Sequence, residues 1–353
     1  MPDKTLASAT AAGAAPVPAW WTSREGQIQG FTDKKVVKGK VAVLAVSPGG
    51  RPVRSVSYGE PEPELRGAAN FNSAVASGDV GAFYKREQRK RPVLVIVGGI
   101  HGQEMEGMMG VVSLLSLMET GKDLMGAGQP GLLEKMQKLR LIAIPLANPD
   151  GRARVPYDGW SGLPLDEMTK WGQGTRKDGT PYGWPHCKAV HPMAGDVGLL
   201  GGYYDDAGVN INHDRWDAPM STVTKSLLEI AHAEGPDMFL NLHGHGANPE
   251  AMPARYLPGA AKREFARFSH GLHHCLRAKG YPCAIPSFFE ENSPAMGPAF
   301  NLDCMMFHSG AAMPVTFECP QGLTCNKRSY SYEDTLNIHH ALFEYAADFL
   351  TGV

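Results

Sequence analysis

The sequence predicts an α/β fold in the form of a three-layer α/β/α sandwich with a mixed, largely parallel central sheet. Four apolar runs rich in Val, Ile and Leu carry this prediction, and segments long enough to hold helices separate them. Runs of this kind are typical of strands that are buried on both faces of an α/β sheet. They cover residues 92–101, 141–148, 237–243 and 313–318.

Other segments complete the predicted layers around this sheet. Residues 36–46 and 52–58 are predicted to form a hairpin, because the Pro-Gly-Gly sequence at 48–50 is typical of a turn. Residues 105–119 carry apolar side chains at helical spacing, and a second helix is predicted over residues 261–279. These elements lie beside or between the four core strands along the chain.

The chain is expected to contain one folded domain. Residues 1–30 are predicted to be a flexible tail, because their first part is rich in Ala, Ser, Thr and Pro without an amphipathic period. Residues 31–353 are predicted to form a single domain, since interleaved strands and helices can share one sheet. The stretch 152–204 is rich in Gly and Pro, and we assign it to the rim of a ligand cleft.

Charge and hydropathy exclude several partners. Lys and Arg number 34 against 36 Asp and Glu, so the net charge of −2 gives no long-range attraction to nucleic acid or to an anionic membrane. No apolar run approaches the length that spans a bilayer, and the N-terminus lacks a clear signal peptide. The sequence therefore favours a cytoplasmic protein and leaves its oligomeric state open.

Each of the four core runs stops at a side chain that can bind metal or transfer protons. These side chains are His101, Asn148, His243 and Glu318. Open α/β sheets bind ligands in a crevice outside the carboxyl ends of their strands. We therefore expect the four side chains to gather at one edge of the sheet.

The strongest local signal is the sequence His101-Gly-Gln-Glu104, which predicts part of a zinc site. Glycines beside the histidine allow a tight turn, on which a His and a Glu three apart can converge on one ion. Catalytic zinc commonly has three His, Glu or Asp ligands and one water, which makes the water acidic enough for hydrolysis. His243 is the predicted third ligand because it ends an apolar run, and His245 is the competing candidate.

A metal site that hydrolyses amides also needs a carboxylate that moves protons without binding the metal. Glu318 fits this role, because a buried carboxylate at the end of an apolar run is costly unless it has a function or a partner. The alternative is that Glu318 is an exposed residue that caps an edge strand. His101, Glu104, His243 and Glu318 together predict a hydrolase with one Zn²⁺ per chain.

These residues resemble the zinc carboxypeptidases of the carboxypeptidase A type. That family has His-x-x-Glu, Asn-Pro-Asp-Gly, Gly-Val-Asp-Leu-Asn-Arg, a His at a strand end and Thr-Phe-Glu, in this order. The resemblance implies a carboxypeptidase-like fold, a catalytic domain over residues 31–353, zinc ligands His101, Glu104 and His243, and Glu318 as general base and acid. The matching segments here lie at residues 101–104, 148–151, 208–213, 243 and 316–318.

The chain departs from the family where the substrate is bound. The family's Asn-Arg pair, which grips a C-terminal carboxylate, reads Asn212-His213, so Arg215 is a candidate for the missing guanidinium. The alternative is that His213 itself binds the carboxylate as a weaker replacement whose charge depends on pH. A second family Arg polarises the scissile carbonyl, and Arg176 is the nearest equivalent here. These departures concern the substrate more than the chemistry.

Two further positions are predicted from the same resemblance. No Tyr lies between Met296 and Glu318, so His308 or Phe307 is expected to cover the substrate where the family places a Tyr. Asp303 lies where the family sets side-chain preference, which would favour basic substrates, or one residue away, which would make it structural.

The function predicted from these residues is a zinc-dependent amide hydrolase. A metallocarboxypeptidase that releases a C-terminal residue from a peptide fits the motifs best. The alternative is an N-acyl amino acid deacylase that resembles succinylglutamate desuccinylase and aspartoacylase, since that branch shares the metal ligands. The substrate is thus predicted to be a peptide or an N-acyl amino acid.

Asp150 and Asn210 are expected to orient ligands or Arg176. The alternative for Asp150 is a purely structural role in the turn at residues 148–151.

Overall fold

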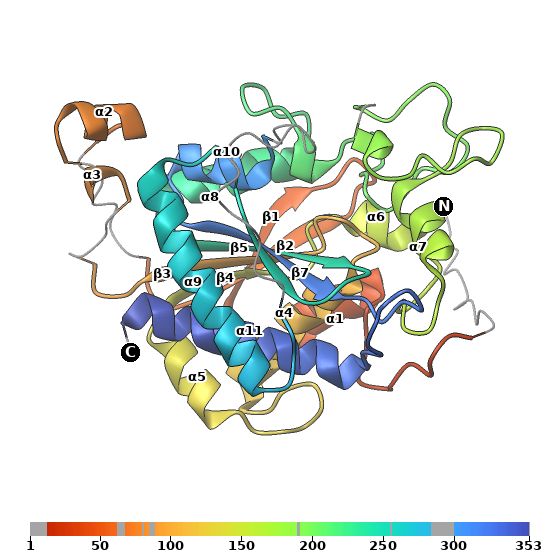
Figure 1. Cartoon of the computed structure of the whole chain (residues 1–353), viewed down its shortest axis with the longest axis horizontal. Coiled ribbons are helices and arrows are strands. Elements are labelled where there is room, and N and C mark those ends of the chain that lie inside the picture. The colour runs from red at the N-terminus through yellow and green to blue at the C-terminus, as the bar shows by residue number, and fades with distance from the viewer. Residues whose placement is uncertain are drawn as a thin grey trace.

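One mixed sheet forms the centre of the molecule (Figure 1). The computed structural model describes residues 13–61, 68–79, 81–84, 89–188, 191–254, 256–283 and 300–352. Within them, seven strands have the order β1-β2-β4-β3-β5-β7-β6. The predicted hairpin and the four core strands are confirmed. The strands are β1 (Lys40–Val46), β2 (Pro52–Tyr58), β3 (Val93–Gly98), β4 (Arg140–Ile144), β5 (Met238–His245), β6 (Glu250–Pro253) and β7 (Pro314–Pro320).

The centre of the sheet is parallel and its margins are antiparallel. Strands β4, β3, β5 and β7 run parallel to one another, whereas β1, β2 and β6 join antiparallel to their neighbours. The carboxyl ends of the four central strands therefore lie at one edge, where sheets of this type bind ligands. This arrangement is the mixed, largely parallel sheet that the sequence predicts.

Helices surround the sheet, and those predicted over residues 105–119 and 261–279 are confirmed as α4 and α9. Among the described residues the helices are α1 (Glu25–Lys35), α2 (Phe71–Ala76), α3 (Gly81–Tyr84), α4 (Met105–Thr120), α5 (Pro130–Gln137), α6 (Pro149–Arg154), α7 (Leu165–Gln173), α8 (Thr222–Glu234), α9 (Gly259–Ala278), α10 (Leu302–Ser309) and α11 (Tyr332–Thr351), with the short 3-10 helices η1 (His186–Lys188) and η2 (Ile211–His213). None of them combines the length and apolar character that crossing a lipid bilayer requires.

Alternate residues of the central strands pack against opposite layers of helices. In β3, Leu94 and Ile96 belong to a core shared with α4, α5, α9 and α11, whereas Val95 and Val97 belong to a core shared with α8 and α10. All six residues of β3 are buried, as an apolar run with helices on both faces requires. Figure 1 shows α8 and α10 on one side of the strands and α4, α5 and α11 on the other. The three-layer sandwich is therefore confirmed.

The packed part of the chain begins earlier than predicted. Residues 1–12 lie outside the described part, but the ring of Trp21 is only 4% exposed and its Nε1 donates to the carbonyl oxygen of Asp158 at 2.7 Å. The hydroxyl of Ser23 donates to the same oxygen, and α1 follows at once. The predicted tail boundary at residue 30 is therefore wrong, because this segment packs against the loop after α6.

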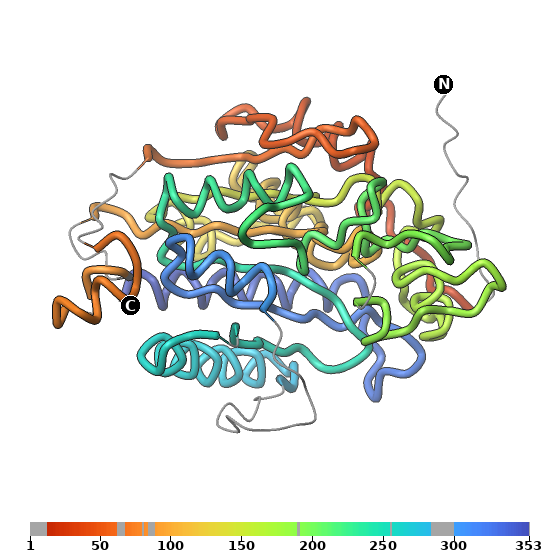
Figure 2. Tube along the Cα trace, turned by 90° about the horizontal axis from the view of Figure 1, so that it is seen from above, coloured from red at the N-terminus to blue at the C-terminus, as the bar shows by residue number. Residues whose placement is uncertain are grey.

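In Figure 2, the β1–β2 hairpin and α9 lie on opposite sides of the molecule.

Candidate active site

Three neighbouring parallel strands carry the candidate site at their carboxyl ends. His101 follows β3, His243 lies near the end of β5, and Glu318 lies near the end of β7. His243 and Glu318 are paired in the register of β5 and β7. Glu104 immediately precedes α4 at its N-terminus. The sheet therefore brings together side chains that are far apart in the sequence.

Two glycines explain why the turn around His101 can form. Gly99 has a φ of +66°, a left-handed conformation that side chains rarely adopt. At Gly102, a Cβ atom would lie 2.1 Å from the backbone nitrogen of Arg152, so no larger residue fits there. The backbone nitrogen of Gly102 donates to the carbonyl oxygen of Gly202 at 2.7 Å. The turn is thus fixed against a distant loop.

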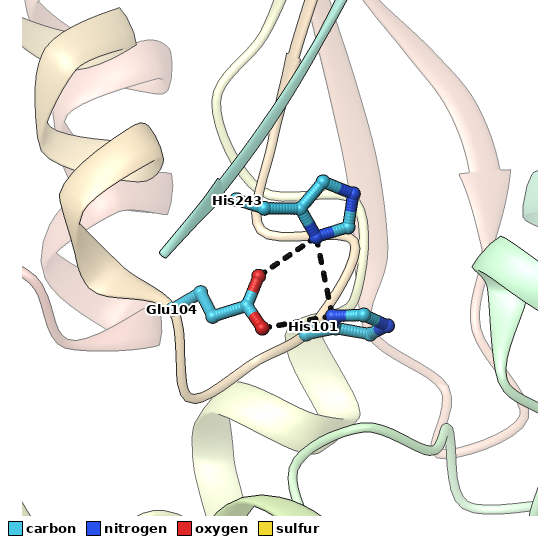
Figure 3. A group of neighbouring side chains, drawn as sticks. All are labelled: His101, Glu104 and His243. Atoms are coloured by element: carbon cyan, nitrogen blue, oxygen red, sulfur yellow. Dashed lines mark hydrogen bonds and ion pairs between the residues drawn. The ribbon is translucent and has the colours of Figure 1, made fainter. Parts of the chain in front are cut away.

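The side chains of His101, Glu104 and His243 converge on one point (Figure 3). Nδ1 of His101 lies 2.9 Å from one oxygen of Glu104, and Nδ1 of His243 lies 2.8 Å from the other. The two Nδ1 atoms are 3.2 Å apart. Bonds of about 2.1 Å at tetrahedral angles place zinc ligand atoms about 3.4 Å from one another, so a small expansion would admit the ion. The three side chains therefore fit zinc.

Electrostatics within this group agree with a cation site. Burial alone would raise the pKa of Glu104, but the adjacent His101 and His243 lower it to about 2. Burial lowers the pKa of His243, yet the carboxylate of Glu104 outweighs it and raises that pKa to about 9. The buried carboxylate of Glu104 therefore favours a positive charge beside it, which a bound metal ion would supply.

Asn210 orients His101 from outside the group. Its Oδ1 lies 3.2 Å from Nε2 of His101 and, as an acceptor, keeps the proton on that nitrogen. Nδ1 is then free to bind a metal, which is the usual purpose of such outer hydrogen bonds. Asp150 has a different role from the predicted one, because its carboxylate accepts from the hydroxyl of Ser47, the backbone of Gly49 and the guanidinium of Arg51 in the β1–β2 turn.

Glu318 lies beside the group without joining it. Burial raises the pKa of its carboxyl, while His243 and His245 act in the opposite direction. Its Oε2 is buried and has no hydrogen-bond partner among the described residues. The strand β7 is also internal, since β6 forms the sheet margin, so Glu318 is not the exposed cap of an edge strand. His245, the competing third ligand, instead places Nε2 at 2.8 Å from the carbonyl oxygen of Asn248.

Asp303 and Asn212 take part in a buried polar network. Nδ2 of Asn241 donates to Oδ1 of Asn212 at 3.2 Å and to the carboxylate of Asp303 at 3.1 Å. The hydroxyl of Thr316 also donates to Asp303, which is only 1% exposed. This geometry fits the structural alternative for Asp303 and not a role in choosing basic substrates. Asn212 keeps its Nδ2 group free of hydrogen bonds to other described residues.

The structure does not bring two predicted site residues, Arg215 and Arg176, to this group. The side chain of Arg215 is 59% exposed and pairs with Asp217 at 3.3 Å. The Arg176 guanidinium lies over the ring of Tyr182, 4.6 Å from its centroid, and donates to the carbonyl oxygen of Pro181 within its own loop. The predicted carboxylate grip at Arg215 and carbonyl contact at Arg176 have no support in this geometry, because both guanidinium groups are held elsewhere.

His308 lies in an aromatic cluster near the end of α10. Its ring stacks on Phe300 and is 5.9 Å from the ring of Trp216. Its Nε2 lies 3.2 Å from the carbonyl oxygen of Tyr256. The neighbouring Phe307 is fully buried. Covering of the substrate by His308 therefore stays a prediction. Phe307 is not a candidate for this role, because its side chain is fully buried.

Two side chains near the site were not singled out from the sequence. The Tyr203 ring stacks on that of His101 with centroids 4.0 Å apart and an angle of 18°. The positive charge of Lys188 acts on both His213 and Glu318, whose pKa values it lowers. Burial is the main reason that the pKa of His213 falls to about 3, so this imidazole is neutral. The sequence signal for Tyr203 was the preceding Gly201-Gly202 pair, which permits close approach.

Comparison with known proteins agrees with this geometry. A family model described as zinc carboxypeptidase matches residues 38–247, which is more than half of the chain and includes His101, Glu104 and His243. The chain therefore belongs to the zinc carboxypeptidase family, whose members are zinc-dependent metallopeptidases. No curated protein matches the chain.

Solved structures share the fold at low sequence identity. A metallo-carboxypeptidase from Burkholderia cenocepacia has a TM-score of 0.54 and 15% identity, over 92% of this chain and 68% of the other. A metallo-carboxypeptidase from Pseudomonas aeruginosa, in complex with (2-guanidinoethylmercapto)succinic acid, has a TM-score of 0.52 and 14% identity, over 92% and 68% of the two chains. Because 92% of this chain is covered in both comparisons, the similarity extends past residue 247.

Proposed function

We propose that this protein is a metallocarboxypeptidase that removes the C-terminal residue from a peptide. The observation that carries the proposal is the convergence of His101, Glu104 and His243 beside a carboxylate, Glu318, that is not part of the group. This is the set of groups that hydrolysis of an amide requires: three ligands, an open position and a separate base. The family match supports the same chemistry.

Each residue has a distinct part in the proposed reaction. His101, Glu104 and His243 would hold zinc, and the chemistry that zinc supplies in such a site is to acidify water and polarise a carbonyl. Glu318 accepts the proton of the attacking water and passes it to the leaving amine, because its free Oε2 faces no protein donor among the described residues. Asn210 holds the ring of His101 in its binding orientation.

The C-terminal carboxylate would be recognised by Lys188 together with Asn212. Lys188 lies on η1, where the hydroxyl of Tyr204 donates to the carbonyl oxygen of the preceding Cys187. The Lys188 ammonium lies over the ring of Trp184, 4.7 Å from its centroid. Its charge lowers the pKa values of His213 and Glu318, so it lies within electrostatic reach of the site. An ammonium attracts a carboxylate through charge, whereas the neutral imidazole of His213 does not. Arg215 pairs with Asp217 on the surface and is therefore not part of the proposed grip.

Parallel substrate panels test this proposal. Zinc-loaded protein is incubated with free-acid peptides and, separately, with N-acyl amino acids, and the released amino acids are quantified. We expect release from the peptides, since no comparison favours the deacylase alternative. Release from the N-acyl amino acids alone would overturn the proposal.

A further inference from the structure

Tyr203 is held against the candidate metal group by contacts on both sides. Its backbone nitrogen donates to the carbonyl oxygen of Gly172 at 2.9 Å. The preceding residue, Gly202, accepts from the backbone of Gly102 at 2.7 Å and from Nδ2 of Asn148 at 3.2 Å. The backbone of Tyr203 is therefore fixed to the same turn that positions His101.

Close approach of this loop depends on small residues. A Cβ atom on Gly201 would lie 2.2 Å from the carbonyl oxygen of Gly172, and one on Gly202 would lie 3.0 Å from the backbone nitrogen of Gln103. These two glycines let the chain pass close enough for the Tyr203 ring to stack on His101. This stacking sets the plane of the Tyr203 ring, and with it the direction of its hydroxyl, relative to His101.

The Tyr203 hydroxyl lies within electrostatic reach of the candidate site. Burial and the charges of Glu104 and Glu318 raise its pKa, whereas a hydrogen bond from the side chain of Gln173 lowers it. Oε1 of Gln173 has no hydrogen-bond partner among the described residues, so the amide nitrogen of Gln173 is the donor. The hydroxyl accepts this bond and keeps its own proton for another acceptor.

The predicted donor to the scissile carbonyl, Arg176, lies over Tyr182 and is bonded to Pro181. A reaction that places negative charge on a carbonyl oxygen gains from a fixed donor aimed at that oxygen. We propose that the hydroxyl of Tyr203 donates a hydrogen bond to the carbonyl oxygen of the scissile peptide bond as that oxygen gains charge. This inference rests on the proposed peptidase function and gives Tyr203 the role that the family assigns to an arginine.

The substitution Tyr203→Phe tests the inference, because it removes the hydroxyl and keeps the ring that stacks on His101. We expect kcat to fall about a hundredfold, with KM and zinc content unchanged, since the loss of one such donor costs that much. Affinity for a phosphonate analogue of the cleaved peptide, measured by calorimetry, should fall by a similar factor. Tyr157→Phe is the matched control, because the Tyr157 hydroxyl bonds Glu167 at 2.9 Å and takes no part in the site.

Two results would overturn the inference. One is a wild-type kcat in Tyr203→Phe, most clearly if kcat falls in Arg176→Ala instead. The other is a loss of zinc from Tyr203→Phe, which would make Tyr203 a structural support of His101. If the wild-type protein cleaves none of the peptides, the proposed function has failed instead, so the two failures are distinguishable.

Discussion

The carboxyl edge of the sheet carries the candidate metal group, whereas the segment between α6 and η2 carries the side chains that we propose to contact the substrate. At the sheet edge, His101, His243 and Glu318 follow or end three adjacent buried strands, and the strand register sets their spacing. In that segment, Tyr203 is placed by backbone hydrogen bonds and glycines, and Lys188 lies over Trp184. The strand register therefore fixes the metal group, whereas no register fixes the proposed substrate residues. A loop can change its residues without disturbing the strands that hold the metal.

The strongest test of the sheet edge is removal of a metal ligand. His101→Ala and His243→Ala should each strip the zinc and abolish turnover, because two protein ligands cannot hold a catalytic ion. Metal analysis by mass spectrometry and peptide assays measure the two effects. His245→Ala is the control and should keep most of its zinc, since His245 contacts Asn248. Full zinc occupancy in both ligand variants would break the assignment.

Glu318→Gln separates the chemistry from metal binding. The amide keeps the shape of the side chain but accepts no proton, so turnover should fall at least about a hundredfold. Zinc content should stay near that of the wild type, because Glu318 is outside the group of three ligands. Unchanged activity in this variant would remove Glu318 from the mechanism.

The sheet edge could be predicted from the sequence for a physical reason. An apolar run that ends in His101, His243 or Glu318 has one plausible place in an α/β sheet, and parallel strands share the edge where such runs end. Tyr203 and Arg176 could not be placed in this way. Their positions depend on contacts between remote parts of the chain, such as that between Gly102 and Gly202, which no local pattern reveals.

The same limit explains why the predicted boundary of the N-terminal tail is wrong. An Ala- and Pro-rich segment has no periodic pattern, yet Trp21 and Ser23 gain a specific partner in the carbonyl oxygen of Asp158. Local composition therefore predicts a flexible segment correctly only when no distant part of the chain binds that segment.

Asn210 precedes η2 and contacts His101 at the sheet edge, so its substitution tests the contact between the two regions. Asn210→Ala should weaken zinc binding about tenfold or more, because outer partners of a metal-binding histidine commonly contribute that much. Competition with a chelator measures the affinity. Asn210→Asp retains an acceptor for Nε2 of His101 and should bind zinc almost normally. Equal zinc affinity in the wild type and Asn210→Ala would show that this contact is dispensable.

The smallest effect is expected on the substrate side. Lys188→Met should raise KM for free-acid peptides about tenfold, which corresponds to the loss of one charge-assisted contact worth about 1.4 kcal/mol. The KM values for amidated peptides should hardly change. Arg215→Ala serves as the comparison, because its guanidinium pairs with Asp217. A larger loss in Arg215→Ala than in Lys188→Met would return the carboxylate grip to Arg215.

The most direct test of the account is the site of cleavage in a defined peptide. Zinc-loaded protein is incubated with a free-acid peptide in water enriched in heavy oxygen, and the products are followed by mass spectrometry. We predict a ladder of peptides shortened one residue at a time from the carboxyl end, each carrying one heavy oxygen in its new terminal carboxylate. Internal cleavage, shortening from the amino end, or equal cleavage of the amidated peptide would contradict the account.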